Sequence, residues 1–175
     1  MEEYPFFLNQ PYAFAVCRIE PENNLHLILA AFESDAPMPL VIVGNWNHSN
    51  YSTELFQKYN AVPGIHLLPS IYDQEKLNFI RSRCRYYLHG HSCGGTNPSL
   101  VEAMYLGLPV IAYDVNFNRE TTENAALYFG SATVLKRLCR ETDESQRLQI
   151  GRKMKEIADR RYIWQRICKR YADLF

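Results

Sequence analysis

The amino-acid sequence predicts an α/β fold, in which a parallel sheet of about six strands is flanked by helices in a single Rossmann-like domain. Short runs of apolar β-formers alternate along the chain with segments of helical periodicity. These runs are continuously apolar, as expected of strands that are buried on both faces. The length of 175 residues suffices for one domain with a full core. We expect one domain over residues 1–175, with a core at 12–130 and a helical tail at 131–175.

The first half of the chain predicts three strands, each followed by a helix. The strands are expected at 12–18, 39–44 and 65–69, and the helices at 21–34, 50–60 and 72–83. In the first helix, the apolar residues between Leu25 and Phe32 recur at helical spacing, and Asn23 or Asn24 is a suitable N-cap. Asp73 is a suitable N-cap for the third helix, because a carboxylate is favoured at a helix start.

The second half predicts three more strands and a helical C-terminal part. The strands are expected at 85–90, 109–114 and 125–130, and helices at 97–107, 131–141 and within 143–175. The last segment has apolar positions at Leu148, Ile150, Met154, Ile157, Trp164, Ile167, Cys168 and Tyr171. We expect Trp164, Ile167 and Tyr171 to pack on the sheet or on neighbouring helices. The alternative is contact with a membrane surface, because basic and aromatic residues are interleaved over 160–170.

The composition excludes several classes of protein. The formal net charge is zero, which argues against a nucleic-acid binder. No apolar run approaches the ~20 residues of a membrane span, and the acidic N-terminus does not resemble a secretory signal. The five cysteines (Cys17, Cys84, Cys93, Cys139 and Cys168) are odd in number and lack CxxC spacing. They indicate reduced thiols in a cytosolic protein.

The segment between the fourth strand and the next helix is rich in glycine. Gly94, Gly95 and Thr96 form the predicted loop. Asn97 is a favoured N-cap, and Pro98 suits the first helical position. Glycines let backbone amides approach a ligand, and a helix start carries partial positive charge, so the junction favours an anion such as phosphate. The alternative is a tight turn without a ligand.

Glu102 lies four residues after Pro98, so it projects from the same face of the helix, near the end that would meet the ligand. A carboxylate there can accept two hydrogen bonds from a sugar diol. Phosphate at the loop and ribose at Glu102 together imply a nucleotide, although Glu102 has the alternative of being a solvated helix residue. The glycines form neither a GxGxxG fingerprint nor a Walker loop, because no Lys-Ser or Lys-Thr follows them.

These motifs resemble a known family. GGTNPSLVEAMYLGLPVIAYD, at 94–114, resembles the donor-site signature of the GT-B glycosyltransferases related to glycogen and sucrose synthases (group 1, family 4), and EAMYLGLPVIA at 102–112 matches it almost residue for residue. VCRIEPENN, at 16–24, resembles that family's loop after the first strand, and FNRETTENAALYF, at 117–129, resembles a later segment that carries a further Glu. HGHSCGGTNPSLVEAM, at 89–104, is similar to a bacterial polysaccharide branch that includes rhamnosyltransferases.

The resemblance implies a set of contacts to the donor diphosphate. Arg18 is implied to clamp the phosphates, because its guanidinium carries a fixed charge and paired donors. The alternative for Arg18 is a surface ion pair with Glu20 or Glu22. The family's partner Lys falls near Asn23, which is a departure. The missing contact would come from Gly95, Thr96 and Asn97 at the helix start.

The resemblance also implies the sugar-binding residues. Glu102 would bind the ribose, and the family's other Glu falls at Gly94, so no carboxylate stands there. His91, Gly94 and Glu120 are placed in the vicinity of the donor sugar; the alternative for Glu120 is to cap a short helix. A 6-deoxy sugar such as rhamnose has fewer hydroxyls and is compatible with the small residue at Gly94. No catalytic residue is assigned, and Asn118 and Tyr72 are weaker candidates for the donor site.

Other side chains near the loop are expected to have no chemical role. His89 and His91 face the same way on an extended chain, but no third ligand is spaced for a metal, and the family's donor site is metal-free. We expect no metal and no cofactor apart from the nucleotide-sugar substrate. His89 is expected to be buried with its hydrogen bonds satisfied. Cys93 has no His and Asp arranged around it and is not expected to be a nucleophile.

The implied function is transfer of a sugar from a nucleoside diphosphate to a glycan or lipid-linked acceptor in bacterial cell-surface polysaccharide synthesis, with retention of configuration. The chain carries only the C-terminal, donor-binding pattern of a GT-B enzyme. We therefore expect the N-terminal, acceptor-binding Rossmann-like domain to be a missing partner and the isolated domain to be inactive. The expected location is the cytoplasm, with peripheral contact at the inner face of the membrane as an option.

Three other classes remain open from the sequence. A nucleotide-sugar epimerase of the same fold would convert the sugar rather than transfer it. A non-catalytic nucleotide-binding module would bind without turnover, and a structural domain would bind no nucleotide at all.

Overall fold

The computed structural model describes residues 9–163, 168 and 172, and its sheet confirms the predicted α/β fold. The strands are β1 (Ala13–Val16), β2 (Leu40–Val43), β3 (Ile65–Leu68), β4 (Tyr86–His89), β5 (Val110–Tyr113) and β6 (Leu127–Phe129). The helices are the 3-10 turn η1 (Pro21–Asn23), α1 (Leu25–Phe32), α2 (Asn50–Tyr59), α3 (Gln74–Arg81), α4 (Pro98–Tyr105), α5 (Asn116–Thr121), α6 (Ala132–Glu141) and α7 (Glu144–Arg161). Each predicted strand is present, one or more residues shorter at its ends.

The six strands form one parallel sheet in the order β3-β2-β1-β4-β5-β6. Ala13 of β1 pairs with Leu40 of β2 on one side and with Tyr86 of β4 on the other. The chain therefore winds outward from β1 in one direction, returns to the centre, and winds outward in the other direction from β4. The carboxyl ends of β1 and β4 flank the point where the strand order reverses, which is where open α/β sheets bind ligands.

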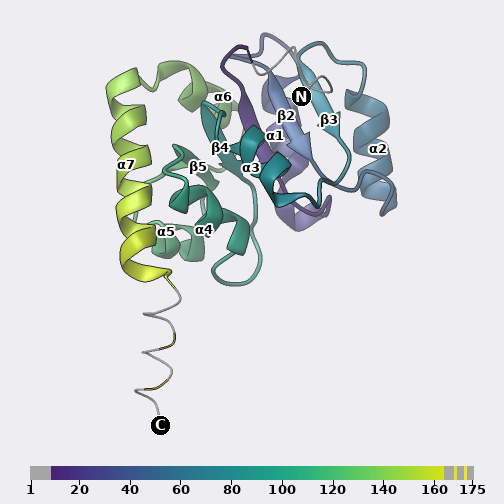
Figure 1. Cartoon of the computed structure of the whole chain (residues 1–175). Coiled ribbons are helices and arrows are strands. Elements are labelled where there is room, and N and C mark those ends of the chain that lie inside the picture. Colours follow the sequence, from purple (N-terminus) through teal and green to yellow (C-terminus); the bar gives the residue numbers. More distant parts are fainter. Residues whose placement is uncertain (1–8, 164–167, 169–171, 173–175) are drawn as a thin grey trace.

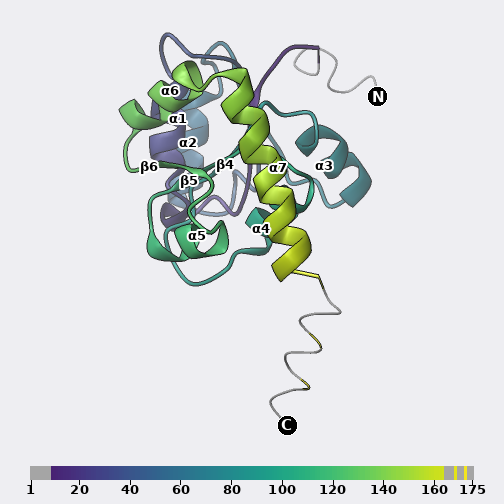
Figure 2. The same cartoon turned by 90° about the vertical axis from the view of Figure 1, so that its left-hand side faces the viewer.

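Helices cover both faces of the sheet. Residues of α1, α2 and α6 pack against one face, and residues of α3, α4 and α7 pack against the other. Figure 2 shows the two layers of helices on either side of the strands. The long helix α7 runs along one side of the molecule beside α4 (Figure 1), where it completes the cover over β5.

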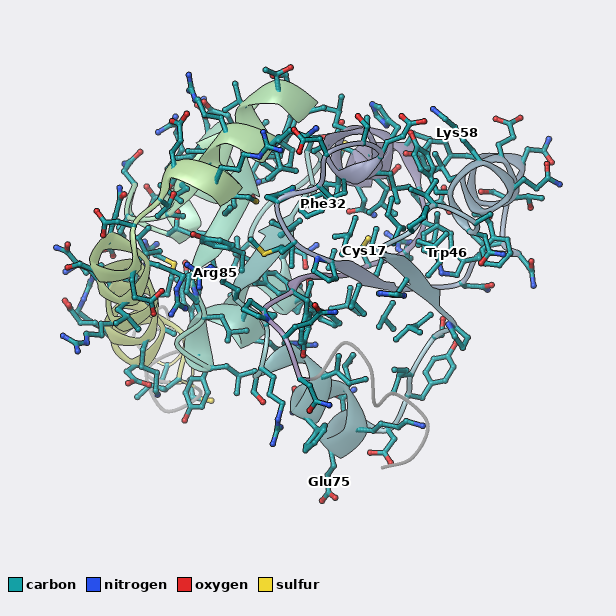
Figure 3. All side chains as sticks on the ribbon, turned by 90° about the horizontal axis from the view of Figure 1, so that it is seen from above. Cys17, Phe32, Trp46, Lys58, Glu75 and Arg85 are labelled. Carbon is teal, nitrogen blue, oxygen red and sulfur yellow. The ribbon has the colours of Figure 1, made fainter. Side chains whose placement is uncertain are left out.

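The helices show the division into buried and exposed faces that their periodicity predicts. Phe32 of α1 is buried, and Figure 3 shows it pointing into the interior. Lys58 of α2 and Glu75 of α3 are exposed at the periphery in the same view. All four residues of β2 and of β4 are buried, as the continuously apolar runs predict.

Two predicted helix caps are confirmed and one is wrong. Asp73 accepts hydrogen bonds from the backbone amides of Glu75 and Lys76, and Asn97 accepts one from Ser99. Asn24 stands at the N-cap position of α1, but its side chain makes no capping hydrogen bond and its backbone is left-handed, with φ 48°. Its side chain instead bonds to another loop, which is described below.

The C-terminal part is helical as predicted, and α5 is an addition. Residues Ile150, Met154 and Ile157 of α7 are buried, whereas Leu148 is exposed. The expected packing of Trp164, Ile167 and Tyr171 concerns positions outside the described residues. Within the part of the chain that the structure describes, no helix combines the length and the apolar character needed to span a membrane.

Candidate functional site

The loops that follow β1 and β4 are joined by side-chain hydrogen bonds. Asn23 donates from Nδ2 to the carbonyl of Arg18 at 2.8 Å, and its Oδ1 lies 2.9 Å from His91 Nδ1. Asn24 donates to the carbonyl of Gly90 at 2.9 Å. The backbone amide of Ser92 donates to the carbonyl of Glu22 at 2.8 Å. The η1 turn is therefore the connection that fixes the Arg18 loop against the His91 loop.

Gly90 permits this close approach. A Cβ atom at position 90 would lie 2.0 Å from the carbonyl oxygen of Asn23 and 3.1 Å from Ile28 Cδ1. Real Cβ atoms do not approach a backbone oxygen that closely, so only glycine fits between the two loops. Gly90 is therefore a glycine because the two loops pack closely at this position.

The hydrogen bonds of Asn23 decide which nitrogen of His91 carries the proton. Asn23 uses its amide nitrogen as donor to Arg18, so its Oδ1 faces His91 as an acceptor. A neutral His91 must then carry its proton on Nδ1, which leaves Nε2 as an acceptor. A methyl group at position 94 would lie 3.9 Å from that Nε2. The free nitrogen therefore faces the glycine loop.

Asn118 supports the same loop from the other side. Its side chain is buried and donates to the carbonyls of His91 and Tyr113, both at 2.9 Å. The ring of Phe117 lies 6.2 Å from that of His91. Asn118 thus positions the loop after β4 against the end of β5, and its amide is occupied by these bonds.

A hollow of about 360 Å³ lies at the carboxyl ends of β1, β2 and β3. Its lining residues are Val16, Cys17, Arg18, Ile19, Val43, Gly44, Asn45, His48, Ser70, Ile71 and Tyr72. Figure 3 shows Cys17 and Trp46 at neighbouring strand ends. Burial raises the pKa of the Cys17 thiol to about 12, so it is a neutral part of the wall. Arg18 is exposed at this hollow, and Tyr72 stands at its edge with 85% of its surface accessible.

The alternative ion pairs that the sequence allowed for Arg18 are not formed. Glu20 lies 3.1 Å from His48 instead. Glu22 forms no ion pair among the described residues, and its backbone carbonyl accepts a hydrogen bond from the Ser92 hydroxyl at 2.9 Å. Arg18 has no ion pair among the described residues, so its guanidinium is available to an anion at the hollow.

The glycine loop leads to the helix start as predicted. Gly94 has φ 88°, a left-handed backbone that favours glycine, and residues 93–96 are exposed. Asn97 Oδ1 accepts from the amide of Ser99 at 3.0 Å and from its hydroxyl at 2.8 Å. The Thr96 hydroxyl lies 3.4 Å from that of Thr121. The amide-rich N-terminus of α4 is thereby presented at the carboxyl edge of the sheet.

Glu102 makes a contact that the sequence did not indicate. Its Oε2 lies 2.6 Å from Nη1 of Arg81, whose side chain is 2% exposed, whereas the Glu102 side chain is 50% exposed. Arg81 comes from the last turn of α3 and was not among the predicted site residues. A signal was present in the sequence, because a basic residue stood on the apolar face of a predicted helix, near Leu77.

Tyr87 of β4 is fully buried, and its ring lies 6.3 Å from that of His89. Its hydroxyl is buried, and burial raises its pKa. Within the described part of the chain the hydroxyl of Tyr87 has no hydrogen-bond partner, so this tyrosine is a packing residue of the strand.

Glu120 points toward α7. It lies in α5, and its Oε1 lies 3.1 Å from Nη2 of Arg161, while its carbonyl accepts from Nη1 of the same residue at 2.8 Å. The pair is exposed, so Glu120 remains free to reorient. The structure brings Arg18, His91, Gly94 and the start of α4 to one edge and leaves Glu120 in a contact with the C-terminal helix.

Cys93 and His89 have no catalytic partners in the described part of the chain. Cys93 is exposed in the loop. His89 is buried as predicted, but the prediction that its hydrogen bonds are satisfied is wrong, because its Nε2 has no partner among the described residues. Burial, with a smaller contribution from His91, lowers the pKa of His89 to about 3. Over the same residues, no group of three His, Cys, Asp or Glu side chains is arranged to hold a metal ion.

Comparison with known proteins identifies the family. Residues 1–144 match the family described as Glycosyl transferases group 1. The chain belongs to the group 1 glycosyltransferases. No curated protein matches the chain. The resemblance to group 1 glycosyltransferases, stated above on the motifs at 16–24, 94–114 and 117–129, is thereby confirmed at the level of the family.

Several solved structures share the fold. The chain superposes on Anabaena HepE, solved in complex with UDP-glucose, with a TM-score of 0.82 and 19% identity, over 95% of this chain and 48% of that one. For sucrose-phosphate synthase from Thermosynechococcus elongatus the TM-score is 0.78 at 21% identity, over 95% and 45%. For the C-terminal domain of the LpcC glycosyltransferase from Francisella tularensis it is 0.68 at 15% identity, over 89% of each chain.

These coverages show how much of each solved chain the protein matches. It spans about half the length of HepE and of sucrose-phosphate synthase, and nearly all of the LpcC C-terminal domain. The six-stranded parallel sheet with its helices thus corresponds to one half of a GT-B fold.

Proposed function

We propose that this group 1 glycosyltransferase domain binds the nucleoside diphosphate part of a nucleotide-sugar donor at the carboxyl edge of its sheet. The observation that carries the proposal is the joining of the Arg18 loop to the His91 loop through Asn23, beside the N-terminus of α4. Two phosphates need cationic or amide donors, and this arrangement supplies both from neighbouring strand ends.

The residues take the following roles in the proposal. Arg18 and the amides of Gly95, Thr96 and Asn97 bind the diphosphate. Glu102 accepts hydrogen bonds from the ribose. The base then extends toward the hollow that Ile71 and Tyr72 border, because that hollow adjoins Arg18.

The sugar is proposed to lie near Gly94, His91 and Glu120. Gly94 leaves room, and the free Nε2 of His91 faces it and can accept a hydrogen bond from a sugar hydroxyl. A 6-deoxyhexose such as rhamnose, which has fewer hydroxyls to bind, suits a site in which position 94 carries no side chain. HepE is described with UDP-glucose, so glucose is the competing choice for the sugar.

Transfer is proposed to require a second Rossmann-like domain that carries the acceptor site. Closure of two domains would exclude water and align a glycan or lipid-linked acceptor with the donor. The domain by itself would bind nucleotide weakly and transfer sugar poorly. We further propose a retaining reaction, without a metal, in bacterial polysaccharide synthesis at the inner face of the cell membrane.

Calorimetric titration with UDP, dTDP and GDP tests the proposal. We expect one of the three to bind, and Arg18→Ala to weaken its binding about 10- to 100-fold, because hydrogen bonds to charged groups contribute about 1.5–3 kcal/mol. Arg152→Ala is the matched control, since Arg152 is an exposed residue of α7 far along the chain from the loops, and it should leave the affinity unchanged.

Three outcomes would overturn parts of the proposal. Binding of none of the nucleotides would leave a structural domain. Equal affinities for wild type and Arg18→Ala would remove Arg18 from the site. If a nucleotide-sugar incubated with the protein came back epimerised, the reaction would be of another class.

A further inference from the structure

We propose that Arg81 is a positioning residue that holds the carboxylate of Glu102 in the one orientation that binds the ribose. This inference rests on the proposed nucleotide binding and adds a residue to it. The two side chains come from different helices, α3 and α4, and meet at 2.6 Å between Arg81 Nη1 and Glu102 Oε2.

Arg81 and Glu102 are buried to different extents, and this difference points to a positioning role for Arg81. Only 2% of the Arg81 side chain is exposed, and its Nε has no hydrogen-bond partner among the described residues. Burying a guanidinium is costly unless a charge compensates it, and Glu102 is the carboxylate that does so here. A stabilising surface pair would leave both ends exposed, whereas this pair exposes the carboxylate alone.

The end of α3 that carries Arg81 is itself fixed. The hydroxyl of Tyr12, the residue before β1, donates to the carbonyl of Ile80. The carbonyl of Arg81 accepts from the amide of Cys84. Arg81 is therefore anchored through its backbone to the centre of the sheet. Because Arg81 is held in place, its guanidinium also fixes the position of the group that it binds.

The remaining oxygen of Glu102 is the one available to a ligand. Arg81 occupies Oε2, and among the described residues none donates a hydrogen bond to Oε1. An exposed glutamate on a helix samples several rotamers, and ordering it on binding costs affinity. The ion pair removes that cost in advance, and the half-exposed Glu102 side chain keeps Oε1 available to a ligand.

The pair also fixes the direction of the Glu102 carboxylate. Half of the Glu102 side chain is exposed, whereas the Arg81 side chain that holds it is buried, so the carboxylate is held from the protein side and is open to a ligand on the other. We infer that the loss of Arg81 would release Glu102 to other rotamers while the rest of the phosphate site remained in place.

The test measures how much more tightly the protein binds a nucleotide with ribose hydroxyls than one without them, in addition to the affinity itself. Each of UDP, dTDP and GDP is titrated against the full chain together with the 2′,3′-dideoxynucleoside diphosphate of the same base, which lacks every ribose hydroxyl. The variants are Glu102→Gln, Arg81→Met, Arg81→Lys and the double variant Arg81→Met with Glu102→Gln. Arg83→Met is the matched control, because Arg83 lies two residues further on, is exposed and stacks on Phe79 at 3.6 Å.

For wild type and Arg83→Met we expect the hydroxyl-bearing nucleotide to bind about 10- to 100-fold more tightly than its dideoxy form. Glu102→Gln and Arg81→Met should each reduce that ratio to about 3-fold or less, although Arg81→Met keeps Glu102. Arg81→Lys keeps the charge without the planar head and should give an intermediate ratio. The double variant should give an affinity ratio no lower than that of either single variant, because the two substitutions remove the same function.

The inference is overturned if Arg81→Met keeps the wild-type ratio, or weakens both nucleotides equally, because a purely structural role lowers all binding together. Should Arg81→Met not fold, Arg81→Lys decides: an unchanged ratio overturns the inference and a reduced one supports it. If wild type binds a nucleotide without discrimination, nucleotide binding survives and the role of Arg81 falls. If wild type binds none of the nucleotides, the proposed function falls with it.

Discussion

Asn23 holds His91 by a hydrogen bond of 2.9 Å between Oδ1 and Nδ1, and through this bond it links the loops after β1 and β4. The side chain of Asn23 is buried, so it cannot itself reach a phosphate. At the position where the resemblance implies a lysine, this chain has a residue that orients a histidine. The polar group it offers to a donor is therefore the imidazole of His91.

The first prediction concerns the tautomer of His91. In a long-range ¹H–¹⁵N spectrum at pH 8, we expect His91 to be protonated on Nδ1 alone, because Asn23 presents an acceptor to that nitrogen. Asn23→Ala should produce the mixture of tautomers that a free imidazole shows. His66, on β3 and remote in sequence from Asn23, serves as the internal control and should not change between the two proteins.

A pure Nε2–H form of His91 in the wild-type spectrum would contradict the hydrogen-bond assignment. In that case Asn23 would have to present its amide nitrogen to His91, and the donor bond to Arg18 would be lost.

The second prediction is that Gly90→Ala destabilises the fold. The added methyl group would lie 2.0 Å from the carbonyl oxygen of Asn23, so one of the two loops must move. We expect the free energy of unfolding to fall by about 2–4 kcal/mol, as measured by urea denaturation. Gly130→Ala is the matched control, because nothing lies within 4 Å of a Cβ atom there, and its effect should stay within about 0.5 kcal/mol. Equal effects of the two substitutions would show that the two loops are not in tight contact.

Much of the fold follows from local patterns in the sequence. The strand runs around Val41 and Leu88 are continuously apolar, and burial on both faces of a parallel sheet requires that pattern. Asp73 and Asn97 cap their helices because their side chains reach the amides two or three residues ahead, a contact that needs no tertiary information. The helix α5 was not predicted, because it is short and its residues, from Asn116 to Thr121, show no apolar face.

Contacts between distant segments could not be predicted in the same way. Asn24 has the sequence position of a helix cap, but its side chain bonds to Gly90, 66 residues away. Arg81 and Glu102 are 21 residues apart on different helices, and their pairing depends on how α3 and α4 pack on the sheet. The sequence could therefore suggest Glu102 as a ligand without showing the arginine that holds it.

The third prediction concerns metal ions. We expect the affinity for the nucleotide that binds to change less than 2-fold between buffer with EDTA and buffer with millimolar Mg²⁺ or Mn²⁺. The physical reason is that Arg18 and the start of α4 supply positive potential directly to the phosphates. Calorimetry at constant ionic strength measures the effect. A tenfold gain with Mg²⁺ would show that a cation bridges the diphosphate and would contradict the expected metal-free site.

The fourth prediction concerns stability at mildly acidic pH. The folded pKa of His89 is lowered to about 3, chiefly by burial, whereas the unfolded value is near 6.5. Below pH 6.5 the unfolded chain binds a proton that the folded protein does not, so the free energy of unfolding falls as the pH decreases. Each pH unit in this range costs about 1.4 kcal/mol, which gives a loss of about 2 kcal/mol from His89 at pH 5.

Other groups can be separated from His89 in this experiment. Burial also lowers the pKa of His66, so that residue contributes in the same direction. The paired carboxyl groups of Asp114 and Glu144 have lowered pKa values, and the stability they provide is lost only as the pH falls below their unfolded values near 4. Between pH 7.5 and pH 5 the histidines therefore dominate. Urea denaturation across this range should show a shallower pH dependence for His89→Gln than for wild type, and a smaller change for His66→Gln. Identical slopes for wild type and His89→Gln would mean that water or a proton reaches His89 in the folded protein.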